Sequence, residues 1–128
     1  NMMRSALENS TLRIYGDGNQ TRTFCYLDDA INGIVNVLNN SLPGSVYNIG
    51  NPTPEISMTN LVKLFNKVTG ANLEYELVPY PDYYPADEPS RRCPNISKAI
   101  REISYNPIYT LEDGLAITYE WSKKSYAS

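Results

Sequence analysis

A short glycine-containing turn between two extended runs is the feature that most constrains this sequence. The first run, residues 12–15, reads L-R-I-Y, and Gly16-Asp17-Gly18 follows it at once. Glycine takes positive φ at no steric cost and Asp can bond its own backbone, so this composition is typical of a turn. We therefore expect a β-hairpin over residues 12–24, with Arg22 just after the turn.

Two interpretations of Arg22 follow from its neighbours. A guanidinium beside apolar and aromatic residues offers a rigid fork of donors suited to a phosphate or a carboxylate. Alternatively, Arg22 is a solvated side chain on an ordinary surface hairpin. The local residues alone favour the second interpretation, because charged hairpins are common.

Length and charge limit the class of protein. With 128 residues, the chain is long enough for one domain with a core, so we expect a single domain over residues 1–128. The net charge of −3 gives no basic face, which argues against a nucleic-acid partner. No apolar run reaches the roughly 20 residues of a membrane span, and no signal-peptide pattern occurs. We therefore expect a cytoplasmic protein without a membrane partner.

Histidine and cysteine content narrows the possible chemistry. The chain has no histidine, which excludes a Ser-His-Asp triad, a Cys-His pair and the commonest zinc sites within it. Cys25 and Cys93 follow no metal or redox spacing, so we expect two reduced thiols. The sequence therefore predicts no metal site.

Apolar periodicity predicts helices in the first half of the chain. Residues 2–7 have helical spacing, and a second helix begins at Asp28 or Asp29 as its N-cap and continues to residue 38. The run Val46–Ile49 has the pattern of a short buried strand. Ser57 is expected to cap a third helix that Gly70 ends.

The second half alternates a strand, a long loop and two helices. Residues 73–78 alternate with period two, as a half-exposed strand should. A proline-rich loop over residues 79–94 follows, which is long enough to be functional or disordered. Asn95 or Ser97 opens a short helix through residue 103, and Thr110 with Asp113 forms a capping box for a last helix through residue 121.

Two strings of residues together resemble a known family. Residues 16–22 read G-D-G-N-Q-T-R, followed by F-C-Y-L-D-D, and residues 87–99 read D-E-P-S-R-R-C-P-N-I-S-K-A. These strings are similar to signatures of the extended short-chain dehydrogenase/reductases, which are NAD-dependent nucleotide-sugar epimerases, dehydratases and decarboxylases. UDP-glucuronate decarboxylases and dTDP-glucose 4,6-dehydratases are the nearest branches. The resemblance extends from residue 1 to residue 121.

The resemblance implies an α/β fold: a small mixed sheet of short strands with four to five helices, as in the C-terminal, substrate-binding portion of an extended Rossmann-type enzyme. It also implies NAD as the cofactor of the parent enzyme. The glycine-rich strand-turn-helix that holds NAD does not occur in these residues, because Gly16-Asp17-Gly18 precedes an extended run. The catalytic Tyr-x-x-x-Lys pair is not matched either, since Tyr119 and Lys123 lie far downstream of its place. No catalytic or cofactor-binding residue is therefore assigned.

Two arginines correspond to the family's phosphate-binding positions. By resemblance, Arg22 and Arg92 grip the diphosphate of a nucleotide-sugar, and a pyrophosphate in a cleft does need fixed cations. The alternative for Arg92 is an ion pair with Asp87 or Glu88 in its own loop. Arg91 is the better candidate for a surface ion pair.

The remaining substrate-binding candidates are Tyr15, Arg13 and Asn1. Tyr15 and the neighbouring Arg13 resemble the strand that holds the nucleobase, although Tyr15 fits a core position with its hydroxyl at the rim equally well. Asn1 resembles an Asn near the sugar phosphates. By the same resemblance, Tyr26 and Asp28 approach the nicotinamide side, but Asp28 is better explained as a helix cap. The tyrosines of residues 80–84 are expected over the sugar or nucleoside.

The sequence thus predicts the part of an NAD-dependent nucleotide-sugar epimerase, dehydratase or decarboxylase that binds a UDP- or dTDP-sugar. The alternative is a truncated, non-catalytic binding or oligomerisation module, so enzymatic activity of this chain itself stays open. A strand at Val46–Ile49 without its sheet neighbours would leave unpaired edges. We therefore expect a homodimer or a strand-exchanged oligomer.

Overall fold

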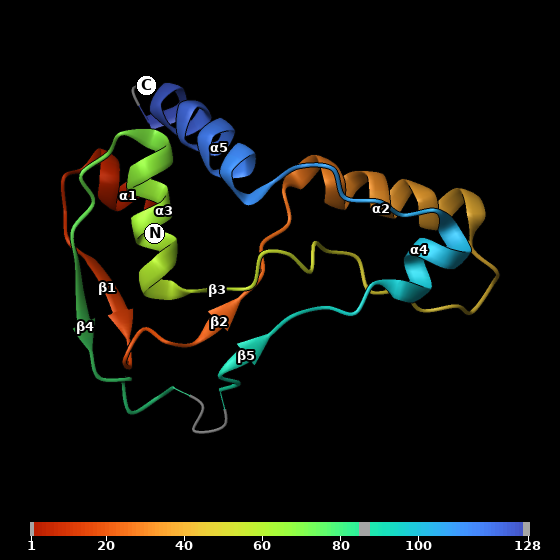
Figure 1. Ribbon diagram of the computed structural model, residues 1–128, viewed down its shortest axis with the longest axis horizontal. Coiled ribbons are helices and arrows are strands. Elements are labelled where there is room, and N and C mark those ends of the chain that lie inside the picture. The colour runs from red at the N-terminus through yellow and green to blue at the C-terminus, as the bar shows by residue number, and fades with distance from the viewer. Residues whose placement is uncertain (1, 85–87, 127–128) are drawn as a thin grey trace.

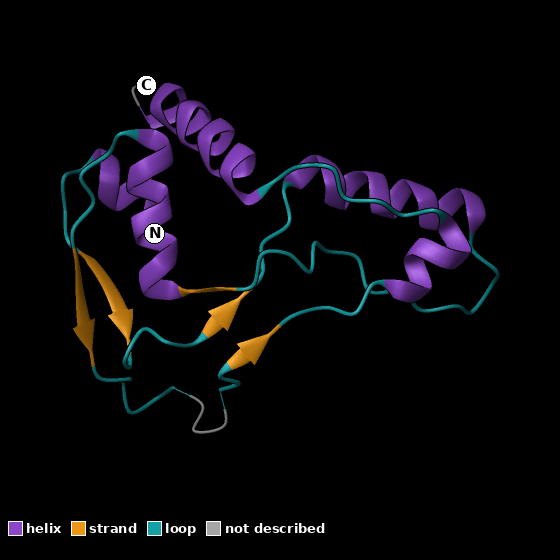
Figure 2. Ribbon diagram, in the orientation of Figure 1, coloured by secondary structure: helices purple, strands orange, loops and turns teal. Residues whose placement is uncertain are grey.

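The computed structural model describes residues 2–84 and 88–126 (Figure 1). Helices and strands alternate irregularly along the chain (Figure 2). The elements, in chain order, are α1 (Met2–Leu7), β1 (Leu12–Tyr15), β2 (Thr21–Arg22), α2 (Leu27–Asn40), β3 (Ile56–Ser57), α3 (Met58–Thr69), β4 (Tyr75–Val78), β5 (Arg91–Arg92), α4 (Ser97–Ile103) and α5 (Leu111–Tyr126). In this part of the chain, no helix is both long and apolar enough to cross a bilayer.

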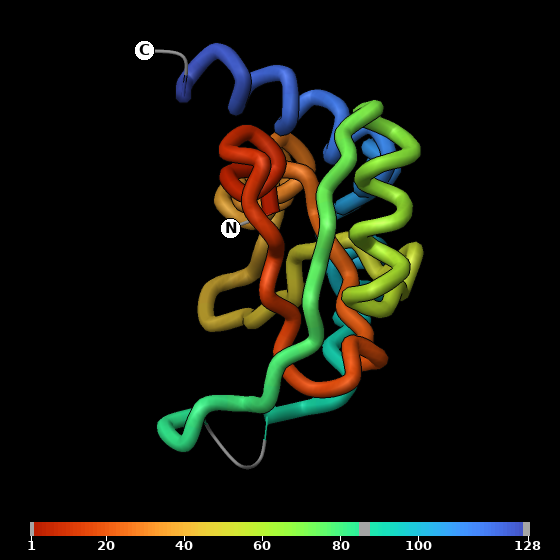
Figure 3. The backbone as a smooth tube through the Cα atoms, turned by 90° about the vertical axis from the view of Figure 1, so that its left-hand side faces the viewer, coloured from red at the N-terminus to blue at the C-terminus, as the bar shows by residue number. Residues whose placement is uncertain are grey.

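The strands form two small sheets, which together give the expected mixed pairing. β1 and β4 pair in parallel, from Leu12 opposite Tyr75 to Tyr15 opposite Val78, and they lie side by side in Figure 3. The other sheet has the order β3-β2-β5, in which β2 is antiparallel to β3 and parallel to β5. The α/β fold class is therefore confirmed, with the strands divided between two sheets instead of one.

The predicted hairpin over residues 12–24 is wrong, although its turn is present. Gly16 and Gly18 both have positive φ, 74° and 72°, and the Gln20 side chain donates a hydrogen bond to the Tyr15 carbonyl at 2.9 Å. The turn carries the chain from one sheet into the other. β1 finds its partner in β4 and β2 finds its partners in β3 and β5, so no ladder joins β1 to β2.

One apolar core lies between α3, α5 and the β1–β4 sheet. Phe65 of α3 is fully buried and its ring meets the Tyr119 ring of α5 edge-on, with centroids 5.2 Å apart. Such aromatic pairs stabilise the fold beyond the contribution of the apolar area that they bury. The buried members of this core are Ile14, Leu61, Val62, Phe65, Leu73, Leu111 and Leu115.

Both ends of α3 and the start of α5 follow the predicted capping chemistry. The Ser57 hydroxyl accepts the Asn60 backbone N–H at 3.3 Å, and Gly70 ends α3 with φ of 69°. At α5, the Asp113 carboxylate accepts the Thr110 N–H and the Thr110 hydroxyl accepts the Asp113 N–H, both at 3.1 Å. These reciprocal bonds are a capping box. α5 continues to Tyr126, beyond the predicted end at residue 121.

The predicted N-cap of α2 at Asp28 or Asp29 is wrong. Tyr26 occupies the cap position without a side-chain hydrogen bond, so both acidic residues lie inside the first turn. Asp29 is 1% exposed and accepts the backbone N–H groups of Ile108 and Tyr109, each at 3.0 Å. Asp29 therefore fastens the segment before α5 to α2.

A second, smaller core joins α4 to the loop after α2. Its buried members are Ile96, Ala99, Ile103 and Tyr105, with Val37, Tyr47 and Ile49 packed against them. The buried strand expected at Val46–Ile49 is not formed: no strand is present there, and Val46 is 79% exposed. No strand of the described residues pairs with this segment, and a strand pattern needs such a partner to become a ladder.

Candidate functional site

Arg22 and Arg92 converge on one carboxylate. They are opposite each other in the parallel β2–β5 pair, so their side chains leave the same face of the sheet. Glu88 Oε1 lies 2.7 Å from Arg22 Nη2, and Glu88 Oε2 lies 2.8 Å from Arg92 Nη2. The side chains of Arg22 and Glu88 are each 18% exposed, while that of Arg92 is 57% exposed. Two cations thus meet at one anion, with Arg92 nearest to solvent.

Backbone carbonyls fix the Arg22 guanidinium further. Its Nη1 donates to the Thr21 carbonyl at 2.8 Å and to the Ser90 carbonyl at 3.4 Å. Ser90 immediately precedes β5, and its carbonyl also accepts the Thr21 N–H at 2.8 Å. The two strands therefore hold the guanidinium in place before any ligand arrives, which lowers the entropy lost on binding.

Arg91 makes its ion pair on the opposite side of β5. Its Nε and Nη2 bind both carboxylate oxygens of Glu55, with Nη2 2.7 Å from Oε2. The Thr21 hydroxyl and the Arg91 guanidinium lower the pKa of Glu55, in that order of importance. Arg91 is ion-paired as expected. Since Arg92 is paired as well, the pairing alone does not distinguish the two arginines.

A polar cavity of about 670 Å³ adjoins this cluster. Its walls come from the chain around β2, from the loop before β3 and from β5 with the residues after it. The lining residues are Arg22, Thr23, Cys25, Asn48, Ile49, Gly50, Asn51, Arg91, Arg92, Cys93, Pro94 and Asn95. The guanidinium groups of Arg22 and Arg92, together with the asparagines of the lining, suit an anionic ligand with polar substituents.

Three tyrosine rings form a cluster at the end of β1. The Tyr15 ring lies 5.8 Å from the Tyr80 ring and 5.6 Å from the Tyr84 ring, and the last two are 4.8 Å apart. Tyr15 is half-buried, outside both apolar cores. Tyr83, from the same segment, is 84% exposed. The end of β1 therefore carries an aromatic surface formed partly by the long loop.

The other predicted substrate-binding residues lie apart from the cavity. Arg13 is on the exposed side of β1, where its Nε is 3.5 Å from Glu76 Oε1 of β4. Asn1 lies outside the described residues. The Tyr26 ring packs on the Tyr109 ring with centroids 4.6 Å apart, and the Tyr109 hydroxyl donates to Asp28 at 3.4 Å. The structure thus gathers Arg22 and Arg92, and it does not bring Arg13 to their cavity.

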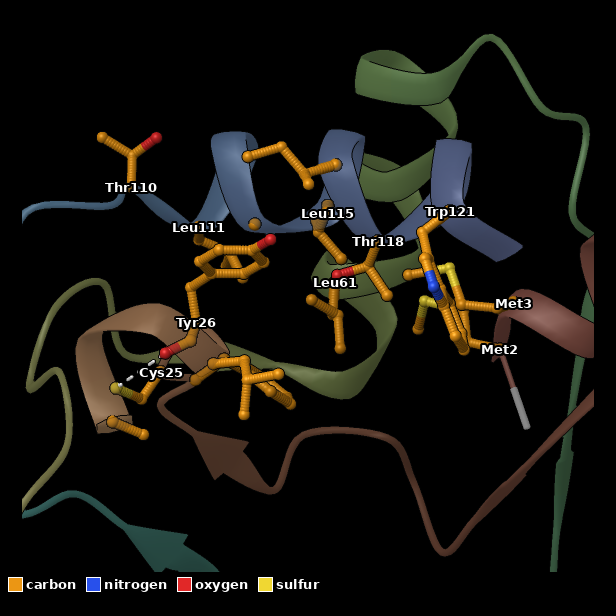
Figure 4. Close-up of a pocket in the computed structure, with 15 residues that line it drawn as sticks. Met2, Met3, Cys25, Tyr26, Leu61, Thr110, Leu111, Leu115, Thr118 and Trp121 are labelled. Carbon is orange, nitrogen blue, oxygen red and sulfur yellow. Dashed lines mark hydrogen bonds between the residues drawn. The ribbon is translucent and has the colours of Figure 1, made fainter. Parts of the chain in front are cut away.

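A larger apolar cavity of about 740 Å³ lies between α1, the start of α2 and α5 (Figure 4). Met2, Met3 and Trp121 gather at one end of it, and Cys25 and Tyr26 lie at the other. Cys25 Sγ is 3.6 Å from the hydroxyl of Tyr105, whose pKa is raised by burial first and by Cys25 second. Both cysteines are free thiols, as expected.

Comparison with known proteins finds similar proteins both by sequence and by structure. Residues 1–50 match the family model of the NAD dependent epimerase/dehydratase family. The UDP-glucuronic acid decarboxylase 1 of Xenopus tropicalis is 34% identical over 124 residues, which are 97% of this chain and 28% of that protein. The UDP-N-acetyl-alpha-D-glucosaminuronate decarboxylase of Bacillus cytotoxicus is 29% identical over 124 residues, which are 95% of this chain and 38% of that protein.

Solved structures agree in fold. The UDP-glucuronic acid 4-epimerase of Bacillus cereus, in complex with UDP-glucuronic acid and NAD, superposes with a TM-score of 0.86 at 33% identity, over 98% of this chain and 39% of that one. The dTDP-glucose 4,6-dehydratase of Bacillus anthracis, in complex with NAD, gives 0.82 at 31% identity, over 98% and 38%.

In sequence and in fold, the chain is similar to one part of these Rossmann-type nucleotide-sugar enzymes. The chain is therefore similar to members of the NAD dependent epimerase/dehydratase family, among them decarboxylases, epimerases and dehydratases. It spans only 28% of the length of the first of these relatives.

The residues described here do not fit the diphosphate of NAD. A dinucleotide site needs a glycine-rich turn that opens a helix, so that the helix N-terminus faces the pyrophosphate. Gly16-Asp17-Gly18 is followed by β2 instead of a helix. The Asp17 carboxylate accepts the Asn19 backbone N–H, with Oδ1 2.9 Å from the nitrogen. Among the same residues, no three His, Cys, Asp or Glu side chains are grouped to hold a metal ion.

Sequence reasoning missed how Glu88 acts and which amides line the cavity. Glu88 was considered only as a partner of Arg92, four residues away, whereas it also binds Arg22 from β2. No local sequence pattern predicts the contact of Glu88 with Arg22, because this contact depends on the pairing of β2 with β5. Asn48 and Asn51 come from a segment predicted as a strand and its following loop, and they lie at the cavity because that segment stays unpaired.

Proposed function

We propose that this chain binds the nucleoside diphosphate part of a nucleotide-sugar for an NAD-dependent epimerase, dehydratase or decarboxylase. The observation that carries the proposal is the convergence of Arg22 and Arg92 at the rim of one polar cavity. These side chains are far apart in sequence, and two adjacent parallel strands bring them together. The similarity to a UDP-glucuronic acid decarboxylase and to a UDP-glucuronic acid 4-epimerase in complex with UDP-glucuronic acid supports the ligand class.

The two guanidinium groups have complementary tasks in this proposal. Arg22 is half-enclosed and anchored by two carbonyls, so it supplies a fixed charge. Arg92 is more exposed and can reach toward an entering phosphate. Charge-assisted hydrogen bonds of this kind contribute about 1.5–3 kcal/mol each. Their role is to hold and orient the ligand, and bond-making chemistry is assigned to no residue of this chain.

The tyrosine cluster provides an apolar surface for the nucleobase side of the ligand. Tyr15, Tyr80 and Tyr84 present flat rings near the end of β1, and such rings stack on bases without regard to base identity. Arg13 and Asn1 belong to the same proposal, as the neighbouring strand residue and the residue on the sugar-phosphate side. UDP- and dTDP-sugars are the expected ligands.

The experiment is a calorimetric titration of the chain with UDP, dTDP and NAD, repeated on Arg22→Ala. We expect one of the two nucleoside diphosphates to bind, NAD not to bind, and Arg22→Ala to weaken the nucleotide about tenfold or more. Tight binding of NAD would contradict the proposal. So would unchanged nucleotide affinity in a folded Arg22→Ala.

A second candidate, a non-catalytic assembly module, is favoured by the outer surface of α2. Exposed apolar side chains cover that surface: Leu27, Ile31, Ile34, Val35 and Leu38, followed by Leu42 and Val46 after the helix. A contiguous surface of this kind marks a protein contact. We expect the isolated chain to form a homodimer through this surface.

A further inference from the structure

We propose that Glu88 is a built-in counter-anion of the phosphate site: it occupies the two arginines in the unliganded chain and is displaced by the diphosphate. This inference rests on the proposed function and adds a residue that sets ligand affinity. Its basis is that one carboxylate bridges the same two guanidinium groups, one oxygen on each, at 2.7 and 2.8 Å.

Both terminal nitrogens of Arg22 already have acceptors in the unliganded chain. Its Nη1 is directed at the carbonyl of Thr21 in β2 and at that of Ser90, which immediately precedes β5. Its Nη2 is directed at Glu88. A phosphate oxygen that binds Arg22 Nη2 therefore competes with the Glu88 carboxylate for this donor.

The charges at the site also favour an exchange of Glu88 for the diphosphate. With Glu88 in place, two guanidinium charges are offset by one carboxylate, and the Glu88 side chain beside them is 18% exposed. A diphosphate brings two negative charges to the same donors, and like charges within a few ångströms repel strongly in a partly enclosed site. Binding is therefore an exchange of one anion for another. Before binding, Glu88 offsets the repulsion between the two arginines. After binding, the diphosphate offsets it.

The test measures UDP and inorganic pyrophosphate binding to the 128-residue chain and to Glu88→Gln and Glu88→Asp. Glutamine has nearly the shape of glutamate without its charge, so we expect UDP to bind Glu88→Gln about tenfold more tightly. Aspartate keeps the charge but is one methylene shorter and cannot bridge both guanidinium groups. We therefore expect a smaller gain, about threefold, with Glu88→Asp.

The matched control is Glu120→Gln, which removes the same charge from an ion pair with Lys123 on α5, away from the cavity. It should leave UDP affinity unchanged. Weaker or equal UDP binding by Glu88→Gln would overturn the inference, because Glu88 would then only position the arginines. An unchanged UDP affinity in Glu88→Asp would also contradict the inference that the Glu88 carboxylate itself occupies the phosphate site.

Pyrophosphate separates this inference from the proposed function. If Glu88→Gln binds pyrophosphate more tightly than the parent chain but neither binds UDP, the counter-anion role stands and the nucleotide proposal fails. If UDP binds the parent chain and Glu88→Gln does not improve it, the nucleotide proposal stands and the counter-anion role fails. If Glu88→Gln binds neither anion, both are contradicted.

Discussion

At the scale of single residues, Asp29 shows how a buried carboxylate can be structural. Both of its oxygens accept backbone N–H groups of the segment before α5, from Ile108 and Tyr109. Asn at this position keeps one acceptor and turns an amide N–H₂ toward the other N–H. We expect Asp29→Asn to lower the free energy of unfolding by about 2–3 kcal/mol, measured by urea denaturation.

The control for that substitution is its neighbour. Asp28 is exposed, and its one described contact is with the Tyr109 hydroxyl at 3.4 Å. Asp28→Asn should change the unfolding free energy by less than about 0.5 kcal/mol. Equal effects of the two substitutions would contradict the anchoring role of Asp29.

The capping box gives a prediction about pH. The pKa of Asp113 is lowered from its usual 3.8, first by the hydrogen bond from the Thr110 hydroxyl and then by that from the Thr110 N–H. A carboxyl group with a lowered pKa in the folded state stabilises the fold above its unfolded pKa and loses that effect as the pH falls through the folded pKa. We therefore expect Asp113→Ala to lower the Tm at pH 7.

The same comparison in acid completes the test. As the pH falls from about 5 to about 2, the Tm difference between the parent chain and Asp113→Ala should shrink, since the carboxylate becomes protonated. Circular dichroism melts at several pH values measure it. A Tm difference that stays constant over this range would show that Asp113 acts through packing and not through its charge.

At the scale of elements, two helical glycines should respond oppositely to the same substitution. A Cβ at Gly33 of α2 would lie 2.9 Å from the buried Tyr105 ring and closer still to Ile49. A Cβ at Gly114 of α5 would make ordinary contacts with Tyr26 at 3.5 Å. Alanine is otherwise the better helix former, by about 1 kcal/mol.

We therefore expect Gly114→Ala to stabilise the chain by about 0.5–1 kcal/mol and Gly33→Ala to destabilise it by about 1–3 kcal/mol. Thermal or urea unfolding of both variants measures the two changes. Stabilisation by Gly33→Ala would mean that α2 and the segment around Ile49 do not approach as closely as the fold requires.

The elements also show which parts of the structure the sequence could predict. The Ser57 and Gly70 caps of α3 and the Thr110–Asp113 box depend on residues a few positions apart, and all were predicted. The hairpin failed because β1 pairs with β4, in which Tyr75 lies opposite Leu12, and no local pattern specifies so distant a partner.

The candidate site follows the same division. Its arginines were identified through a family resemblance, which carries long-range information that periodicity lacks. The bridging contact of Glu88 with Arg22 was not predicted, because it exists only once β2 and β5 are paired. The role of Asp29 was missed for a similar reason: its partners lie in a segment near the other end of the chain.

At the scale of the whole molecule, two small cores leave one long helix face uncovered. Figure 1 shows α2 with α4 at one end of the molecule and α1, α3 and α5 at the other. Leu38 of α2 is 78% exposed. We expect light scattering to show dimers of the isolated chain, and Leu38→Glu to weaken dimerisation about tenfold or more, because a buried apolar contact becomes a charge.

Asn32→Glu is the matched control, since Asn32 is an exposed polar residue of the same helix. It adds the same charge outside the apolar surface and should leave the dimer intact. A monodisperse monomer of the parent chain at high concentration would count against self-association through α2.

The central claim is that Arg22 and Arg92 together hold a nucleoside diphosphate, and its most direct measurement is UDP affinity in Arg92→Ala beside Arg101→Ala. Arg101 is an exposed arginine of α4, paired with Glu102 at 3.2 Å and absent from the cavity. Both variants lose one positive charge, but only Arg92 faces Glu88 and Arg22. We predict at least tenfold weaker binding for Arg92→Ala and no more than about a twofold change for Arg101→Ala. Equal affinities in the two variants would contradict the account.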